Sequence, residues 1–263
     1  MSYQPRHPLK VCKHVWHALF MREAMARMSA DRFGWSWILL EPILHLTVFI
    51  GVRQLMGRVK YIQGAEFIPW LIIGIISFMI FRDAMMRSMG AIRANSSLFA
   101  YRQVHPIDPV IVRAFLEFTI RSVVLTLIIV SLMFFGDYRG PDEPLLVIAM
   151  WILAWWLGLS FGLVVSVVAT IAEEIEKIVK LLMFPLYMLS GAIFPLKALP
   201  YSLRDVLMYN PMVHVLELLR HAYFHGYYML SGVSLLYPVQ CALVASLLGL
   251  MLHVRFKSRL MSA

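Results

Sequence analysis

The sequence predicts an all-α integral membrane protein with about six transmembrane helices. Its 263 residues are 60% hydrophobic and only 15% charged, and the mean hydropathy is +0.74, far above that of a soluble domain of ordinary composition. The apolar residues gather in runs of about twenty, the length at which an α-helix crosses the hydrocarbon core of a bilayer. Lipid, rather than water, is therefore the main solvent of this chain.

Six apolar segments have the length of a membrane span. We expect helices in all of them, because an open sheet edge leaves backbone groups without partners in lipid, and the runs lack the alternating pattern of a membrane barrel strand. An even number of spans places both termini in the same compartment. We expect residues 1–263 to form a single transmembrane domain. The six segments are 36–56, 67–89, 114–135, 145–171, 177–196 and 233–254.

Lys and Arg residues are distributed unequally between the two sides of the predicted topology. Sixteen lie on the side of the termini and seven on the other side, with Arg121 left inside the third span. Because basic residues are enriched on the cytoplasmic side of membrane proteins, we expect both termini in the cytoplasm. The same distribution accounts for the net charge of +9. It argues against a nucleic-acid-binding protein, in which basic residues gather on one face.

The cytoplasmic segment 1–35 begins with an amphipathic helix over residues 6–20. At about 100° per residue, Lys10 and Lys13 share one arc with other basic residues, and Trp16 lies with apolar residues on the opposite arc. We expect the basic arc to face anionic lipid headgroups and Trp16 to enter the acyl boundary. Two roles stay open for this helix, a plain membrane anchor or a gate beside a lipid-linked substrate.

Ionisable groups inside the predicted spans need partners, because an unpaired charge is costly in lipid. Glu117 and Arg121 stand four residues apart, so we expect them to form a structural ion pair on one helix face. Glu41 precedes Pro42 in the first span and is expected to brace a neighbouring helix. An ion-coupled secondary carrier, with Glu41, Glu117 or Asp83 as proton sites, is the rival interpretation. The lack of internal repeats argues against that carrier.

The cytoplasmic connection 90–113 predicts a short docking helix. Polar residues at its start can act as helix caps, and two prolines end it. Its aromatic side chains form an exposed knob that has no lipid to enter, so we expect it to fit a groove on a soluble partner. The alternative is packing against the protein's own helix ends. The docking residues that we expect are Asn95, Ser96, Leu98, Phe99, Tyr101 and Arg102.

The periplasmic connection 197–232, between the fifth and sixth spans, is amphipathic but too polar to span the membrane. We expect short re-entrant helices here, since non-helical backbone at membrane depth is tolerated where it lines a cavity or is buried in protein. Two roles stay open for its aromatic residues, stacking on sugar rings that pass through or forming an interfacial aromatic belt. The tyrosines concerned are Tyr201, Tyr209, Tyr223 and Tyr227.

Neither a metal site nor an ATP site is predicted. His214, Glu217, His221 and His225 share one segment, but their spacing matches no zinc-protease pattern. No GxxxxGK[ST] motif occurs, so the chain supplies no Walker-type nucleotide site. We therefore expect a membrane permease rather than an enzyme, with no cofactor bound by this chain.

Three stretches of the chain match the pattern of a known family. They are FGWSWILLEPILHL in the first span, NSSLFAYRQVHPIDPVIVRAFLE in the cytoplasmic connection, and FPLYMLSGAIFPLKALP with NPMVHVLELLRHAYFHGY on the periplasmic side. In these stretches the chain resembles permease subunits of ABC transporters of the ABC-2 type. It is most similar to the KpsM-like exporters of capsular polysaccharide in Gram-negative bacteria, which are related to O-antigen permeases.

The resemblance implies a homodimer in the bacterial inner membrane that exports lipid-linked polysaccharide. Two separate ATP-binding subunits in the cytoplasm would hold ATP and Mg²⁺, and each would take the coupling helix around Asn95 to Tyr101 into a groove. The resemblance also implies that 197–225 forms an outer gate and that the N-terminal helix flanks the access route of the polymer. Membrane lipids and a periplasmic export adaptor are further expected partners, and an O-antigen, drug or lipid exporter is the nearest alternative.

An acidic polymer would give several basic residues a function. A positive lining lowers the electrostatic cost of moving anions through a region of low dielectric constant. The alternative for Arg82 and Arg87 is snorkelling at helix ends. Six helices also enclose too little space for a polysaccharide, which favours a dimer. The channel candidates are Arg53, Arg58, Arg82, Arg87 and Arg93.

Overall fold

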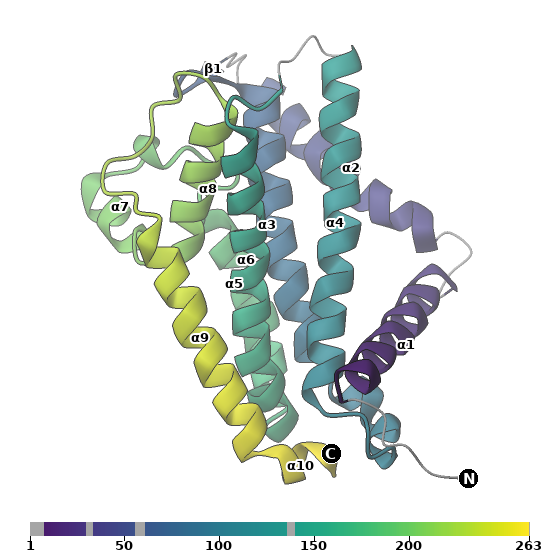
Figure 1. The fold of residues 1–263 in the computed structure, drawn as a ribbon. Helices are drawn as coiled ribbons and strands as arrows, with labels where there is room; N and C mark the ends of the chain where they lie inside the picture. Colours follow the sequence, from purple (N-terminus) through teal and green to yellow (C-terminus); the bar gives the residue numbers. More distant parts are fainter. Residues whose placement is uncertain (1–7, 30–33, 56–60, 136–139, 263) are drawn as a thin grey trace.

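The computed structural model describes residues 8–29, 34–55, 61–135 and 140–262. Apart from one two-stranded hairpin, the regular elements of these residues are helices (Figure 1). In chain order the elements are α1 (Pro8–Ser29), α2 (Gly34–Leu55), β1 (Tyr61–Ile62), β2 (Ala65–Glu66), α3 (Phe67–Met89), the 3-10 helix η1 (Arg93–Ala100), α4 (Ile107–Phe135), α5 (Pro144–Ile171), α6 (Glu174–Leu189), the 3-10 helix η2 (Leu196–Ala198), α7 (Tyr201–Leu207), α8 (Pro211–Tyr223), α9 (Leu236–Arg255) and α10 (Lys257–Met261).

Four of the described helices are long and apolar enough to cross a bilayer. They are α3, residues Ile107–Phe134 of α4, α5 and α9, with 23, 28, 28 and 20 residues. Each overlaps one of the six predicted segments, which confirms a helical membrane protein. α2 coincides with the first predicted segment and contains a shorter apolar stretch, Ser36–Val52.

The fifth predicted segment, 177–196, is too long. α6 has 16 residues and ends at Leu189. Gly191 then has a φ of +76°, a left-handed conformation in which a helix ends, and the short η2 follows Pro195. At about 1.5 Å per residue, α6 extends roughly 24 Å, less than the roughly 30 Å of the hydrocarbon core. The residues after Leu189 therefore belong to a turn and not to a span.

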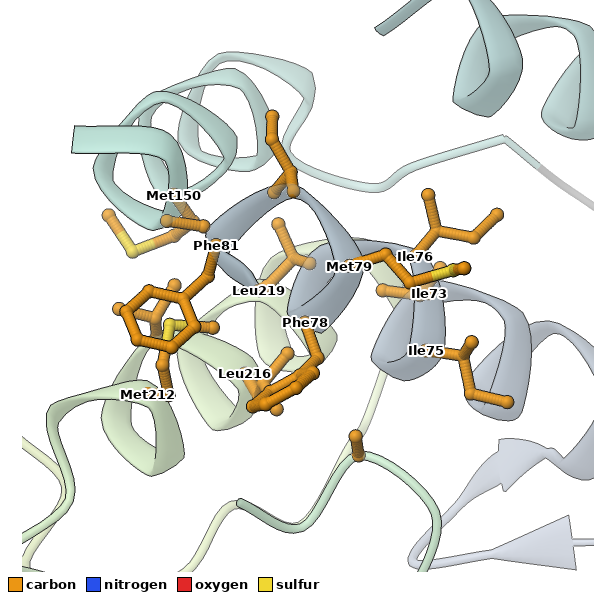
Figure 2. Close-up of a cluster of buried hydrophobic side chains, with 14 of the residues drawn as sticks. Ile73, Ile75, Ile76, Phe78, Met79, Phe81, Met150, Met212, Leu216 and Leu219 are labelled. Atoms are coloured by element: carbon orange, nitrogen blue, oxygen red, sulfur yellow. The ribbon is translucent and has the colours of Figure 1, made fainter. Parts of the chain in front are cut away.

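The central helix of the bundle is α3, whose side chains are almost all buried. α4 and α5 pack against α3, and α9 packs against α5 (Figure 1). The short α8 lies against both α3 and α5. Figure 2 shows this contact, where Phe78 and Phe81 of α3 meet Met212 and Leu216 of α8 and Met150 of α5. Side chains therefore fill the centre of the single chain.

The close approach of α3 and α5 depends on Gly158 of α5. A Cβ atom at this position would lie 2.5 Å from the backbone oxygen of Phe81 and 2.9 Å from the Cβ of Ala84. Neither atom can move aside as the tip of a flexible side chain can. We expect Gly158→Ala to lower the unfolding free energy by about 1–3 kcal/mol, as overpacking does, with a lower melting temperature of the purified protein.

Gly51→Ala in α2 is the matched control. A Cβ at Gly51 would meet nothing within 4 Å, so this variant should melt no lower than the original protein. Equal losses of melting temperature in the two variants would contradict the tight contact between α3 and α5.

A hairpin that the sequence analysis did not predict connects α2 to α3. β1 and β2 are antiparallel, with Tyr61 opposite Glu66. Gln63 and Gly64 form the turn, and both have positive φ angles. The backbone N–H of Tyr228 donates to the oxygen of Gln63 at 3.0 Å, which fastens the hairpin to the segment after α8. The hairpin lies at one end of the bundle, whereas η1 and both ends of the described chain lie at the other (Figure 1).

Candidate functional site

A short helix is present as η1 in the connection where a docking helix was predicted, but one of its aromatic side chains differs from the prediction. Phe99 is buried with Ile92, Val110 and Leu163, so the prediction of an exposed Phe99 is wrong. The alternative, packing against the protein's own helices, holds for this side chain, because the turn after α3 and the helices α4, α5 and α10 surround it with apolar side chains. Tyr101 is 66% exposed and Arg102 is exposed, whereas Ser96 and Leu98 are half-buried.

Asn95 ties η1 to α1. It is fully buried, and its amide nitrogen donates to the backbone oxygen of Ala91 at 2.8 Å and to Glu23 at 3.3 Å. Its side-chain oxygen accepts from Arg22, and Glu23 accepts from Arg113 of α4 at 3.1 Å. Asn95 therefore does not cap a helix start as predicted. We call Arg22, Glu23, Asn95 and Arg113 the α1–η1 junction.

The α1–η1 junction keeps its carboxylate charged. Burial on its own would raise the pKa of Glu23. The hydrogen bond and the charge of Arg113, together with Asn95 and Arg22, outweigh that effect and hold the pKa of Glu23 below its ordinary value. Glu23 therefore stays an acceptor at neutral pH, and it connects α1 with both η1 and α4.

The helix α1 is longer than the predicted range of 6–20 and packs against α4. Lys10 and Lys13 are exposed, as a basic interfacial face requires. Trp16 is only partly available to lipid, because its indole N–H donates to Asp108 of α4 at 2.9 Å. We expected the whole Trp16 side chain to enter the acyl boundary. Its indole N–H instead binds a carboxylate of the same protein, so the expectation is wrong for this end of the ring.

Two carboxylates and two guanidinium groups connect α2, α3 and α4. Arg82 donates to Glu41 at 2.9 Å and to Asp83 at 2.8 Å. Arg121 donates to the other oxygens of the same carboxylates, to Glu41 at 3.0 Å and to Asp83 at 2.6 Å. Each carboxylate is shared by both arginines, so the charges balance. We call these four residues the four-charge cluster.

The expected ion pair between Glu117 and Arg121 is replaced by contacts with other helices. Arg121 belongs to the four-charge cluster, and Glu117 pairs with Arg27 of α1 and with Arg87 of α3, the latter at 3.5 Å. Spacing of four residues permits a pair on one helix face, but groups on neighbouring helices supply the opposite charges here. The pairing of Glu117 therefore fixes α1 against the bundle.

The remaining basic candidates are in part outside the described residues. This holds for the side chain of Arg53 and for the whole of Arg58. Arg93 bridges Glu173 at 3.2 Å and donates to the backbone oxygen of Ala169. Within the single chain, Arg93 and the two arginines of α3 thus each neutralise a carboxylate.

The connection 197–232, which the sequence analysis assigned to the periplasm, contains α7 and α8, two helices too short to span a bilayer. Its tyrosines divide into two pairs. Tyr201 and Tyr209 are 79% and 77% exposed, whereas Tyr223 and Tyr227 are buried. The expectation that all four are available to sugars or to the interface is therefore wrong for Tyr223 and Tyr227. Tyr223 ends α8, Tyr227 lies in the segment after it, and both belong to the buried core around α3.

A residue that the sequence analysis missed, Arg220, anchors α8. It is fully buried and donates to the backbone oxygens of Gly191 at 2.8 Å and Ala192 at 3.0 Å. Its guanidinium group also lies 3.6 Å from the ring centre of Trp70 in α3. Arg220 therefore binds the turn after α6 to both α8 and α3. The one signal in the sequence was a lone arginine in a helix otherwise rich in apolar residues.

The histidines of this region make separate contacts. His214 contacts the backbone oxygen of Met208 at 2.8 Å, and His225 contacts Asp142 at 2.7 Å. Glu217 accepts from Tyr227 at 3.0 Å. In the part of the chain that the structure describes, no three His, Cys, Asp or Glu side chains are placed to hold a metal ion.

The helices from α1 to α8, with the α1–η1 junction and the four-charge cluster, lie in a region that is shared with known proteins. The sequence model of the ABC-2 type transporter family matches residues 14–224, a range that extends from α1 to the end of α8. The chain belongs to the ABC-2 type transporter family. The resemblance drawn from the three sequence stretches is confirmed at this level.

Relatives of this ABC-2 chain match it along nearly its whole length. The polysialic acid transport protein KpsM of Escherichia coli is 37% identical over 250 residues, which cover 94% of this chain and 95% of KpsM. The capsule polysaccharide export inner-membrane proteins CtrC of Neisseria meningitidis and BexB of Haemophilus influenzae are each 29% identical over 248 residues, 94% of this chain and 93% of the relative. The ABC-2 chain is a multi-pass inner-membrane protein.

Proposed function

We propose that this chain is the membrane-spanning subunit of an ATP-driven exporter of lipid-linked acidic capsular polysaccharide. It acts as a homodimer with two separate ATPase subunits in the cytoplasm, where ATP and Mg²⁺ bind. The observation that supports this function best is the similarity to capsule polysaccharide exporters over 94% of the chain. A periplasmic export adaptor receives the polymer on the far side.

In this proposal, α2 and α6 complete six crossings of one transmembrane domain. The distribution of Lys and Arg, sixteen against seven, supports a cytoplasmic location of both termini and of η1. A helix as short as α6 is accommodated by local thinning of the bilayer or by snorkelling of its flanking residues. Lys177 and Lys180 at the cytoplasmic start of α6 suit that adjustment.

The polymer passes between two copies of the chain. The centre of one copy is filled by α3, so a polysaccharide has no route through it. Exposed Tyr201 and Tyr209 on the periplasmic gate segment are available to stack on sugar rings. Arg53 and Arg58 remain candidates for a positive lining on the same side.

Two sets of contacts connect η1 with the bundle and so support its role as the coupling element. Phe99 packs among neighbouring helices, and Asn95 is bound to α1 through the α1–η1 junction. A movement imposed on η1 is therefore passed to α1, α4 and α5 together. The surface that remains for the ATPase includes Tyr101 and Arg102.

Tyr101→Asp is expected to reduce the ATPase subunit that co-purifies with the tagged chain by at least about tenfold, because an interface tyrosine is replaced by a charge. Tyr61→Asp is the matched control, since Tyr61 is 63% exposed at the opposite end of the bundle. Both variants should elute from a sizing column like the original protein. Undiminished ATPase on Tyr101→Asp would contradict the docking role of this surface.

Other cargoes are compatible with the same coupling surface. An ABC-2 exporter of O-antigen, a drug or a lipid would still retain an ATPase. The cargo is therefore tested by complementation: the chain should restore capsule export in cells that lack their own permease.

An ion-coupled carrier would continue to transport after ATP depletion and would lose transport in the variant Glu117→Gln. That function is less well supported, since Glu41 and Asp83 are each neutralised by two arginines.

A further inference from the structure

A cavity of about 480 Å³ opens between α1 and the adjoining parts of α2, α3 and α4. Its polar wall holds three carboxylates and three guanidinium groups, so the formal charges of the lining cancel. Its apolar wall combines two residues of α2 with one each of α1 and α4. The polar side chains are Glu23, Glu41, Glu117, Arg27, Arg87 and Arg113, and the apolar ones are Ala26, Trp37, Ile38 and Leu116.

Two of these charged groups have bonding capacity left. The carboxylate of Glu117 is almost completely buried, and Arg27 and Arg87 pair with it through its Oε1 atom. The Oε2 atom has no hydrogen-bond partner among the described residues. Arg87 is 57% exposed and contacts Glu117 only at 3.5 Å. A buried acceptor that lacks a donor therefore lies beside a cation that is open to a further acceptor.

An apolar surface leads away from the cavity along α2. Trp37 is 60% exposed at the cavity, and Leu40, Ile43 and Leu44 are exposed on the following turns of the helix. The helix α1 runs obliquely to the other helices (Figure 1), and these side chains of α2 are exposed in the single chain. In a multi-pass membrane protein such a surface faces hydrocarbon chains. The cavity thus combines a polar head site with a path for acyl chains.

We infer that this cavity binds the headgroup of a membrane phospholipid that combines a phosphate with an ammonium group, as in phosphatidylethanolamine. Arg87 binds the phosphate, because a guanidinium group is suited to phosphate oxygens. The ammonium group donates to the carboxylate of Glu117, which lines the cavity, and the acyl chains follow α2. A lining whose formal charges cancel suits a headgroup without net charge, whereas an anionic polymer would meet three carboxylates.

The lipid holds α1 in place against the bundle. Glu117 and Arg27 connect α4 with α1 at the cavity, and Glu23 connects α1 with η1 at the same wall. An occupant that satisfies Glu117 therefore stabilises the position from which α1 contacts the coupling element. This inference requires only a membrane location and does not rest on the proposed export function.

Native mass spectrometry of the full chain in detergent tests the inference with three lipids of matched acyl chains. Phosphatidylethanolamine supplies phosphate and N–H donors, phosphatidylcholine supplies phosphate without N–H donors, and phosphatidylglycerol supplies a net negative headgroup. We expect phosphatidylethanolamine to be retained about tenfold more strongly than the other two, as loss of a charge-assisted hydrogen bond predicts. Equal retention of the three lipids, or a preference for phosphatidylglycerol, would overturn the inference.

Variants locate the binding. Glu117→Gln should lower retention of phosphatidylethanolamine to that of phosphatidylcholine. Arg87→Gln should lower retention of both lipids. The side chain of Arg87 is largely exposed, so this variant should fold and the test stands even where Glu117→Gln fails to fold. Lys180→Gln, an exposed cation outside the cavity, should change nothing. Unchanged retention in Arg87→Gln would place the lipid elsewhere and refute the assignment. The assay contains neither ATP nor polymer, so its outcome is independent of the export proposal.

Discussion

Arg121→Met should lower the unfolding free energy by roughly 3–5 kcal/mol, the cost of removing one partner from a buried ion pair. Its side chain is 2% exposed and donates to both Glu41 and Asp83. Without it, two carboxylates share the single guanidinium of Arg82, and one negative charge is left uncompensated among α2, α3 and α4. Thermal denaturation of the detergent-solubilised protein, followed as the fraction that still elutes as a folded species, measures the loss.

The control for this variant is an exposed ion pair of the same chain. Lys180 pairs with Glu176 at 2.6 Å, but its side chain is 56% exposed, so Lys180→Met should cost no more than about 0.5 kcal/mol. The double variant Arg121→Met with Asp83→Asn removes one charge of each sign and should recover part of the stability. If the double variant is as unstable as the sum of the two single variants, the four-charge cluster is not a coupled unit.

Arg220→Met should destabilise the protein at least as much as Arg121→Met and should loosen residues 190–223. The substitution leaves the backbone oxygens of Gly191 and Ala192 without their donor, at about 1–3 kcal/mol for each buried acceptor. It also removes the contact between the guanidinium and the ring of Trp70, whose energy is about 2 kcal/mol when buried. Amide hydrogen exchange is expected to rise in residues 190–223 before it rises in α3.

Arg204 offers a matched control, because it makes the same kind of bond at a partly exposed position. Its guanidinium donates to the backbone oxygens of Leu199 at 2.7 Å and Lys197 at 2.6 Å. Water can replace it there, so Arg204→Met should cost no more than about 1 kcal/mol. Equal destabilisation by Arg204→Met and Arg220→Met would mean that burial does not give Arg220 its role.

The sequence predicted the helices well because their signal is local. Runs of apolar residues fixed the positions of α2, α3, α5 and α9 to within a few residues. The end of α6 was placed too late, since the residues from 190 to 196 are apolar enough to continue a helix while Gly191 adopts a positive φ angle. Hydropathy cannot distinguish a buried turn from the last turn of a span.

The side-chain contacts of the candidate site were harder to predict because they join residues distant in the sequence. Glu117 and Arg121 stand four residues apart, yet each binds residues from other helices. Phe99 was predicted to be exposed because it follows a polar stretch in a cytoplasmic connection. In the structure, apolar side chains of neighbouring helices bury it. Asn95 was selected as a cap, whereas its actual partners on α1 are 72 and 73 residues away. Local pattern therefore located most of the helices and misjudged several contacts between them.

The most direct test of the central claim is transport in proteoliposomes that contain this chain and its ATPase partner. Uptake of a lipid-linked acidic polysaccharide into vesicles of inverted orientation is measured with ATP, without ATP, and with a protonophore. The proposed function predicts uptake that requires both ATP and the partner and that continues when the proton gradient is abolished. Uptake that persists without ATP and stops with the protonophore would contradict it.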